Sequence, residues 1–140
     1  MFYFTASMKR KIYSILLLVW TIVILVAVLL PKEDMITKPH FLVDIPHIDK
    51  VVHTVLFGVF AFLLAKVLKA KSFRIKILCI ISIAIALIFG LLTECLQKIL
   101  YDYIQRDFSW LDFLADSVGV SLALIIFTCC LAKRKHTKNS

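Results

Sequence analysis

Glycine and proline are scarce in this chain, which has only three of each among its 140 residues. This scarcity excludes a collagen-like chain and a disordered segment rich in these residues. The four cysteines form no Cys-x-x-Cys pair and no zinc-finger spacing, so they indicate neither a metal centre nor a redox motif. Acids are also few, nine against 17 Lys and Arg. The chain is instead 61% hydrophobic, with a mean hydropathy of +0.94, against roughly 45–50% apolar residues in soluble domains.

Long uncharged stretches occur four times along the chain. The first runs from Ile12 to Leu30, and at ~1.5 Å per residue its length of about 28 Å is enough to cross a bilayer core. It is longer than a signal-peptide core and lacks a small-residue cleavage pattern, so we expect a permanent anchor. Spans of about 20 residues, counted from the flanking basic residues, fall at about 12–30, 49–68, 77–97 and 112–132. We therefore predict an all-α protein, an antiparallel bundle of four transmembrane helices in a single domain covering residues 1–140.

Basic residues are concentrated in alternate connections between the spans. Three lie at 9–11, five at 66–76 and four at 133–138, so twelve of the 17 Lys and Arg occur in segments without an acid. Lys and Arg favour the cytoplasmic side of a membrane. Four spans with both termini in the cytoplasm satisfy this rule at every connection. The net charge of +8 then follows from membrane topology, and we predict membrane lipids, not nucleic acid, as partners.

Ionisable residues recur near the predicted external ends of the last three spans. His53 lies ~6 Å below the start of the second span, Glu94 ~3 Å inside the third, and Asp116 ~4.5 Å inside the fourth. A charged side chain at the bilayer centre costs at least ~2.5–3.5 kcal/mol, so such groups normally face the bundle interior or water. We therefore predict a polar pocket that is open to the outside and lined by all three helices.

Residue spacing adds further candidates to this pocket. The pairs Asp49/His53, Glu94/Gln97 and Asp112/Asp116 are three or four residues apart, so each pair shares one helix face. Asp112 could alternatively act as a residue that stabilises the start of its helix. Arg106 can hold a carboxylate or a phosphate, or it can simply close the bundle through a salt bridge to Glu94 or Asp112. Lys50 offers a second cation at the same level.

Three sequence blocks resemble the motifs of VanZ-like membrane proteins. They are "DKVVHTVLFGVFAFLL" at 49–64, "ECLQ" at 94–97 and "RDFSWLDFLADSVG" at 106–119. The matching positions are Asp49, Lys50, His53, Glu94, Gln97, Arg106, Ser109, Asp112 and Gly119. Asp116 departs from the pattern, since the family usually has Asn there, which implies a hydrogen-bonding position or a protonated carboxyl group. The resemblance implies a protein of the bacterial cytoplasmic membrane and cell envelope, linked to susceptibility to glycopeptides such as teicoplanin, but no settled biochemical activity.

Two functions are consistent with these residues. The favoured one is a non-enzymatic envelope protein, without a cofactor, whose pocket binds an anionic lipid headgroup, a lipid-linked envelope precursor, a glycopeptide or a partner protein. Its ligand-binding candidates are Asp49, Lys50, His53, Glu94, Gln97, Arg106, Ser109, Asp112 and Asp116. The alternative is a small intramembrane enzyme acting on a lipid-linked precursor, with His53, Glu94 and Asp112 as an acid–base or metal site. A transporter is a weaker option, because the candidate polar groups cluster at one side of the predicted bundle and a path across the other half would need an oligomer.

Overall fold

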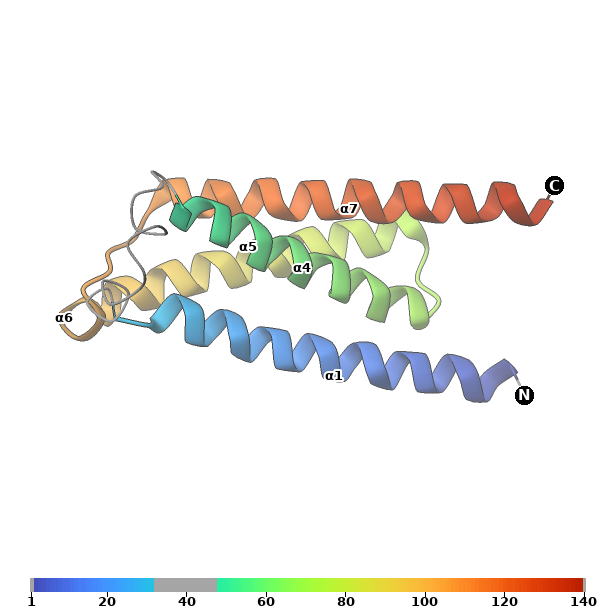
Figure 1. The fold of residues 1–140 in the computed structure, drawn as a ribbon, viewed down its shortest axis with the longest axis horizontal. Coiled ribbons are helices and arrows are strands. Elements are labelled where there is room, and N and C mark those ends of the chain that lie inside the picture. The colour runs from blue at the N-terminus through green and yellow to red at the C-terminus, as the bar shows by residue number, and fades with distance from the viewer. Residues whose placement is uncertain (1, 32–47, 140) are drawn as a thin grey trace.

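The computed structural model describes residues 2–31 and 48–139, and all the regular structure in these ranges is helical. The helices are α1 (Phe2–Leu29), α4 (Ile48–Ala70), α5 (Ile75–Ile99), α6 (Tyr101–Ile104) and α7 (Trp110–Asn139), as Figure 1 shows. Four helices are long and apolar enough to cross a membrane, over Ser7–Leu29, Ile48–Ala70, Ile75–Ile99 and Trp110–Lys133. The predicted all-α fold with four candidate spans is therefore confirmed.

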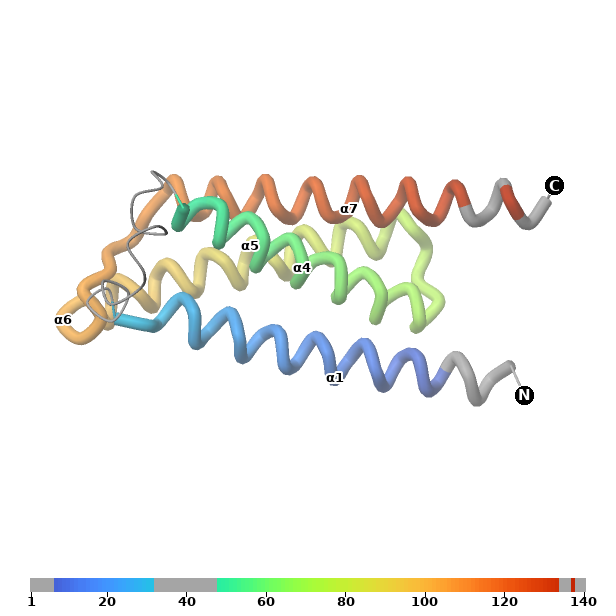
Figure 2. The backbone as a smooth tube through the Cα atoms, in the orientation of Figure 1, coloured from blue at the N-terminus to red at the C-terminus, as the bar shows by residue number. Residues whose placement is uncertain are grey.

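The four long helices run in alternating directions (Figure 2). Both ends of the described chain lie at the same end of the molecule as the turn between α4 and α5, while α6 lies at the opposite end (Figure 1). The predicted connection between the first two spans falls within 32–47, outside the described residues. The basic segments at 9–11 and 66–76 and the start of the C-terminal basic segment therefore share one end, here called the basic end. The other end is called the α6 end.

Two helices extend beyond their predicted spans. α1 begins at Phe2 and α7 continues to Asn139, although both pass through clusters of Lys and Arg. Lys and Arg end an uncharged run but have high helix propensity, and no Pro or Gly interrupts either extension. Pro31, unlike the Lys and Arg clusters, does stop a helix, because the residue before a proline disfavours helical geometry. α1 accordingly ends at Leu29.

The core lies between α4 and its neighbours, and it is made of apolar side chains. Phe57, Ala61 and Phe127 are fully or almost fully buried, and Phe57 and Phe60 both pack against the ring of Phe89. Half of the α4 window is buried, compared with 11% for α1. The outward faces carry many exposed large apolar side chains. Because soluble proteins rarely expose such extensive apolar surface, these faces are suited to lipid.

Glycine brings α4 and α7 into close contact. A Cβ atom added to Gly119 would overlap the carbonyl oxygen of Thr54, and one added to Gly58 would lie 3.1 Å from the carbonyl oxygen of Gly119. Small residues of this kind allow helix backbones to approach closely in membranes. The Thr54 hydroxyl also donates to the carbonyl of Ala115 at 3.2 Å. These contacts fix the height of α7 against α4, and so the height of the polar residues on both.

Two polar contacts attach α1 to the other helices. The Trp20 indole N–H donates to the carbonyl of Leu56 on α4 at 2.9 Å. The Gln97 amide on α5 donates to the carbonyl of Val28 on α1 at 3.0 Å. Val28 belongs to the last turn of α1, where carbonyls lack a partner within the helix. Gln97 therefore satisfies one of these carbonyls.

Candidate functional site

Three ionisable side chains from three helices meet in a buried layer near the α6 end. His53 (α4), Glu94 (α5) and Asp116 (α7) are 2%, 0% and 0% exposed. Each lies five or six residues from the end of its helix, which at ~1.5 Å per residue is a depth of about 7–9 Å. His53 Nδ1 lies 2.9 Å from Asp116 Oδ1 and 4.0 Å from Glu94 Oε1. These three residues are called the buried triad.

Each carboxylate of the buried triad has one paired and one unpaired oxygen. Glu94 Oε2 accepts a hydrogen bond from the backbone N–H of Ser109 at 2.8 Å, and Asp116 Oδ1 is paired with His53. Glu94 Oε1 and Asp116 Oδ2 find no hydrogen-bond partner among the described residues. Leaving a buried polar atom unpaired costs roughly 1–3 kcal/mol, and more for a charged group. Two such oxygens in one cluster call for an explanation by function.

The side of the triad toward the basic end is apolar. The ring of Phe57, one turn further along α4, stacks on His53 with a 12° angle between the ring planes and 6.2 Å between centroids. Gly90 on α5 leaves space beside Asp116, since a Cβ added there would lie 2.9 Å from Asp116 Oδ2 and 3.4 Å from the Phe57 ring. The triad therefore lies at the boundary between the apolar core and the polar α6 end.

A second polar layer covers the triad on the side of the α6 end. Lys50 Nζ lies 3.3 Å from Asp112 Oδ1, and Arg106 Nη1 lies 3.6 Å from Asp49 Oδ1. The Lys50 and Asp49 side chains are 31% and 43% exposed, whereas those of Asp112 and Arg106 are 11% and 12% exposed. These four residues, two cations and two carboxylates, are called the rim.

The segment between α6 and α7 closes the site. Gln105 ends α6 with a left-handed backbone conformation (φ 52°), which reverses the chain toward α7. Ser109 then follows, and its backbone N–H reaches Glu94 while its side-chain oxygen accepts the N–H of Asp112 at 3.3 Å. Ser109 thus acts as the N-terminal cap of α7 and also fixes the carboxylate of Glu94.

The structure differs from the predicted open pocket in two ways. His53, Glu94 and Asp116 are enclosed, and the segment bearing Ser109 contacts Glu94 through a backbone hydrogen bond. Gln97, although three residues from Glu94, points to α1 and bonds with Val28 instead of joining the triad. Residues three apart on a helix differ by about 60° in direction, enough for each to face a different neighbour.

Two groups of residues could hold a metal ion within the part of the chain that is described. They are Asp49, His53 and Asp112, and His53, Glu94 and Asp116, and in each group the potential ligand atoms lie within 4.8 Å of one another. The sequence-based set of His53, Glu94 and Asp112 mixes the two layers. In the structure Asp116, not Asp112, joins His53 and Glu94. The i, i+4 spacing predicted that both aspartates share one helix face, but it could not decide which one lies against the histidine.

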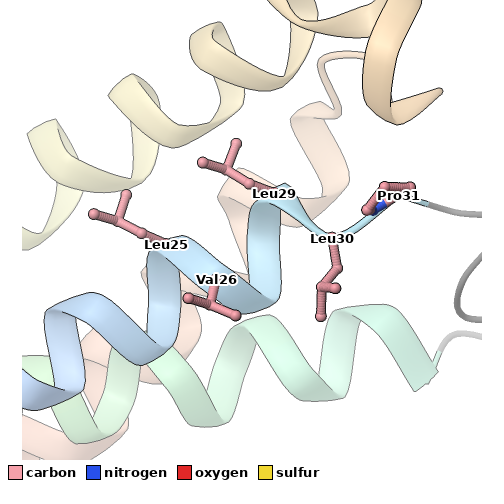
Figure 3. Close-up of a pocket in the computed structure, with 5 residues that line it drawn as sticks. All are labelled: Leu25, Val26, Leu29, Leu30 and Pro31. Atoms are coloured by element: carbon pink, nitrogen blue, oxygen red, sulfur yellow. The ribbon is translucent and has the colours of Figure 1, made fainter.

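A separate, open recess near the end of α1 is mostly apolar in its lining. Leu25, Val26, Leu29, Leu30 and Pro31 line a volume of about 340 Å³ (Figure 3). None of these residues belongs to the triad or the rim. An apolar recess on a candidate membrane span can accommodate an acyl chain, but it offers no group for chemistry.

Comparisons of this chain with models of protein families, with curated proteins and with solved structures found no match. The resemblance to VanZ-like proteins therefore stays a prediction from the three sequence blocks. The evidence for the candidate site is therefore the arrangement of its residues in this structure.

Proposed function

We propose that this chain is a multi-pass protein of the bacterial cytoplasmic membrane that binds an anionic headgroup at its outer surface. The basic end would face the cytoplasm, because Lys and Arg are retained on that side during insertion. Both termini would then be cytoplasmic, and the α6 end, with the rim and the buried triad, would lie at the level of the outer headgroups.

The observation that carries this proposal is the arrangement of the rim cations. The 3.3 Å separation of Lys50 and Asp112 exceeds the 2.7–2.9 Å of a strong charge-assisted hydrogen bond, and Lys50 is partly exposed. Lys50 can therefore turn from Asp112 to a phosphate, provided that the ligand also offers a donor to the largely buried Asp112 carboxylate. Arg106, 3.6 Å from Asp49, supplies a planar group suited to two phosphate oxygens.

The rim carboxylates indicate which groups the ligand would carry besides phosphate. Asp49 and Asp112 would be released toward the bound molecule when the cations turn to phosphate, and they can accept hydrogen bonds from hydroxyl or amine groups. A lipid-linked envelope precursor combines phosphate with such groups at this membrane level. The VanZ-like motifs support three parts of the proposal: the bacterial cytoplasmic membrane as the location, an envelope precursor as the ligand, and the link to glycopeptide susceptibility.

Binding to lipids of defined headgroup tests this proposal. Purified protein in nanodiscs should bind an isoprenoid-phosphate lipid, and Lys50→Gln and Arg106→Gln should each weaken binding at least about tenfold, as expected for loss of a charged contact of ~1.5–3 kcal/mol. Lys98→Gln is the matched control, since Lys98 is an exposed cation in the last turn of α5 at the same end. Equal affinity in all four proteins would contradict the proposal. In cells, the two rim variants should also change teicoplanin susceptibility while the control does not.

A second candidate function is favoured by the 2.9 Å contact between His53 and Asp116. A histidine oriented by a carboxylate can serve as a general acid or base. Two nearby hydroxyls are already engaged: Ser109 accepts the Asp112 N–H, and Ser117 donates to the Phe113 carbonyl. An intramembrane hydrolase would therefore use water as its nucleophile. Release of phosphate or headgroup from isoprenoid-phosphate lipids by the wild type, abolished in His53→Gln, would support this function, and no turnover would exclude it for those lipids.

A further inference from the structure

We propose that His53, Glu94 and Asp116 form a binding site for one divalent transition-metal ion, with Zn²⁺ as the reference ion. The site is distinct from the rim, and it stands whether or not the rim binds a headgroup. One imidazole nitrogen and two carboxylates are a nitrogen and oxygen donor set that divalent first-row metals accept readily.

The separations of the donor atoms suit an ion of this size. Zinc–nitrogen and zinc–oxygen bonds of about 2.0–2.2 Å place two ligand atoms about 3.3 Å apart in a tetrahedral site. His53 Nδ1 lies 2.9 Å from Asp116 Oδ1 and 4.0 Å from Glu94 Oε1, values on either side of that distance. Side-chain shifts of less than about 1 Å would therefore bring these two pairs of atoms to that distance, and a water molecule would take the fourth position. On binding, the metal would replace the proton shared by His53 and Asp116.

The unpaired oxygens and the charge of the buried triad also favour a divalent metal ion as the ligand. Glu94 Oε1 and Asp116 Oδ2 belong to fully buried side chains and find no partner within the described ranges. Two carboxyl groups enclosed beside an apolar core are costly to ionise without a cation, and with both ionised the site would hold two negative charges out of reach of water. A divalent cation balances the charges of both ionised carboxylates and supplies the missing partner of Glu94 Oε1. A protonated His53 alone would balance only one of them.

Gly90 leaves space for the Asp116 carboxylate of the proposed metal site. The nearest heavy atom to a Cβ added at Gly90 would be Asp116 Oδ2, at 2.9 Å, so any side chain there would push the carboxylate away from its present position. The unpaired oxygen thus occupies room that only glycine leaves free.

The other possible metal group is less suited to hold an ion. In the group formed by Asp49, His53 and Asp112, both carboxylates already have cationic partners, Arg106 and Lys50. These carboxylates are also nearer the surface, and they share His53 with the buried triad. They are therefore placed to pass an ion from the rim toward the triad, a path that an enclosed site requires.

Metal binding by the full chain in detergent or nanodiscs tests the inference. After treatment with a chelator, the wild type should bind about one equivalent of Zn²⁺, measured by competition with a chromophoric chelator. Co²⁺ should give visible absorption bands typical of nitrogen and oxygen ligands, and Zn²⁺ should remove them. Failure of the wild type to bind either ion would overturn the inference without reference to any variant.

Matched variants locate the site. Asp116→Asn and Glu94→Gln keep the size of each side chain, and each should lower Zn²⁺ affinity more than tenfold, since even outer-shell changes cost 10–100-fold. Asp112→Asn, one turn away on the same helix, should change affinity by less than about threefold. If Asp112→Asn lowered the affinity as much as Asp116→Asn, the ion would belong to the rim and the assignment to the triad would be wrong. Loss of Zn²⁺ binding in Asp116→Asn with headgroup binding retained would separate this site from the proposed function.

Discussion

Replacing Gly119 with alanine tests the close contact between α4 and α7. The new methyl group would overlap the carbonyl oxygen of Thr54 and lie 2.8 Å from its carbonyl carbon, closer than side-chain carbons approach other atoms. Both obstacles are backbone atoms, so no rotamer change can relieve them. The helices would have to separate by roughly 1 Å to restore ordinary van der Waals distances.

The cost of that separation can be worked out from the structure. Overpacking of a core typically costs ~1–3 kcal/mol, and an immovable backbone contact places Gly119→Ala at the upper end of this range. Alanine recovers up to ~1 kcal/mol of helix propensity relative to glycine. The net loss is therefore about 2 kcal/mol. A shift of about 1 Å would also stretch the 2.9 Å contact between His53 and Asp116 beyond hydrogen-bonding distance.

Thermal unfolding of purified protein, followed by fluorescence-detected size exclusion, is the assay for this effect. Gly119→Ala should lower the apparent melting temperature by about 5–10 °C. Gly58→Ala is the matched control, because its added Cβ would lie 3.1 Å from the Gly119 carbonyl oxygen, a contact that a small adjustment relieves. Its melting temperature should change by less than about 3 °C. A Gly119→Ala protein as stable as the Gly58→Ala protein would refute the reasoning about backbone contact.

Two further predictions concern residues that join the helices. Gln97→Leu should destabilise the protein by about 1–3 kcal/mol, because it leaves the Val28 carbonyl without the amide that now donates to it. The exposed control Lys98→Gln should not alter the melting temperature. Equal stability of the two variants would contradict the contact between Gln97 and Val28. Ser109→Ala should cost about 0.5–1 kcal/mol through loss of the helix cap on Asp112, whereas Ser109→Thr should retain most of the stability. Because the bond to Glu94 uses the backbone of Ser109, Zn²⁺ affinity should be the same in all Ser109 variants, and a changed affinity would argue against that bond.

The fold of four candidate membrane spans could be predicted closely from the sequence, because long apolar runs bounded by charges define the helices. Expected spans such as 77–97 lie within the observed helices, here Ile75–Ile99. Helix ends were harder to place, since Lys and Arg mark the limit of the membrane but also favour helix. α7 therefore continues past Lys133 to Asn139.

The composition of the site could be predicted in part. Counting residues from the basic segments predicted a common height for His53, Glu94 and Asp116, and helical spacing predicted that Asp112 and Asp116 share one helix face. The direction of each side chain around its helix could not be obtained in this way, because it depends on which neighbours pack where. Asp116, expected as a hydrogen-bonding position from its departure from the VanZ-like pattern, makes the 2.9 Å contact with His53.

Sequence spacing also gave no signal for the contacts made by the backbone. The bond from the Ser109 N–H to Glu94 depends on the left-handed turn at Gln105, a conformation that Gln rarely adopts and that sequence patterns do not predict. The same bond holds the segment before α7 against Glu94, on the surface side of the buried triad. An open pocket was therefore the natural expectation from sequence, and an enclosed triad beneath a polar rim is the finding from structure.

A double-mutant cycle on His53 and Asp116 measures most directly whether helices α4 and α7 join these side chains. The free energy of unfolding would be obtained by titration with sodium dodecyl sulfate in bicelles for His53→Ala, Asp116→Ala, the double variant and the wild type. A buried, charge-assisted hydrogen bond at 2.9 Å predicts a coupling energy of about 1.5–3 kcal/mol. The control cycle pairs His53→Ala with Asp102→Ala, an exposed acid on α6, and should be additive within about 0.5 kcal/mol. Additive effects of His53→Ala and Asp116→Ala would contradict the account.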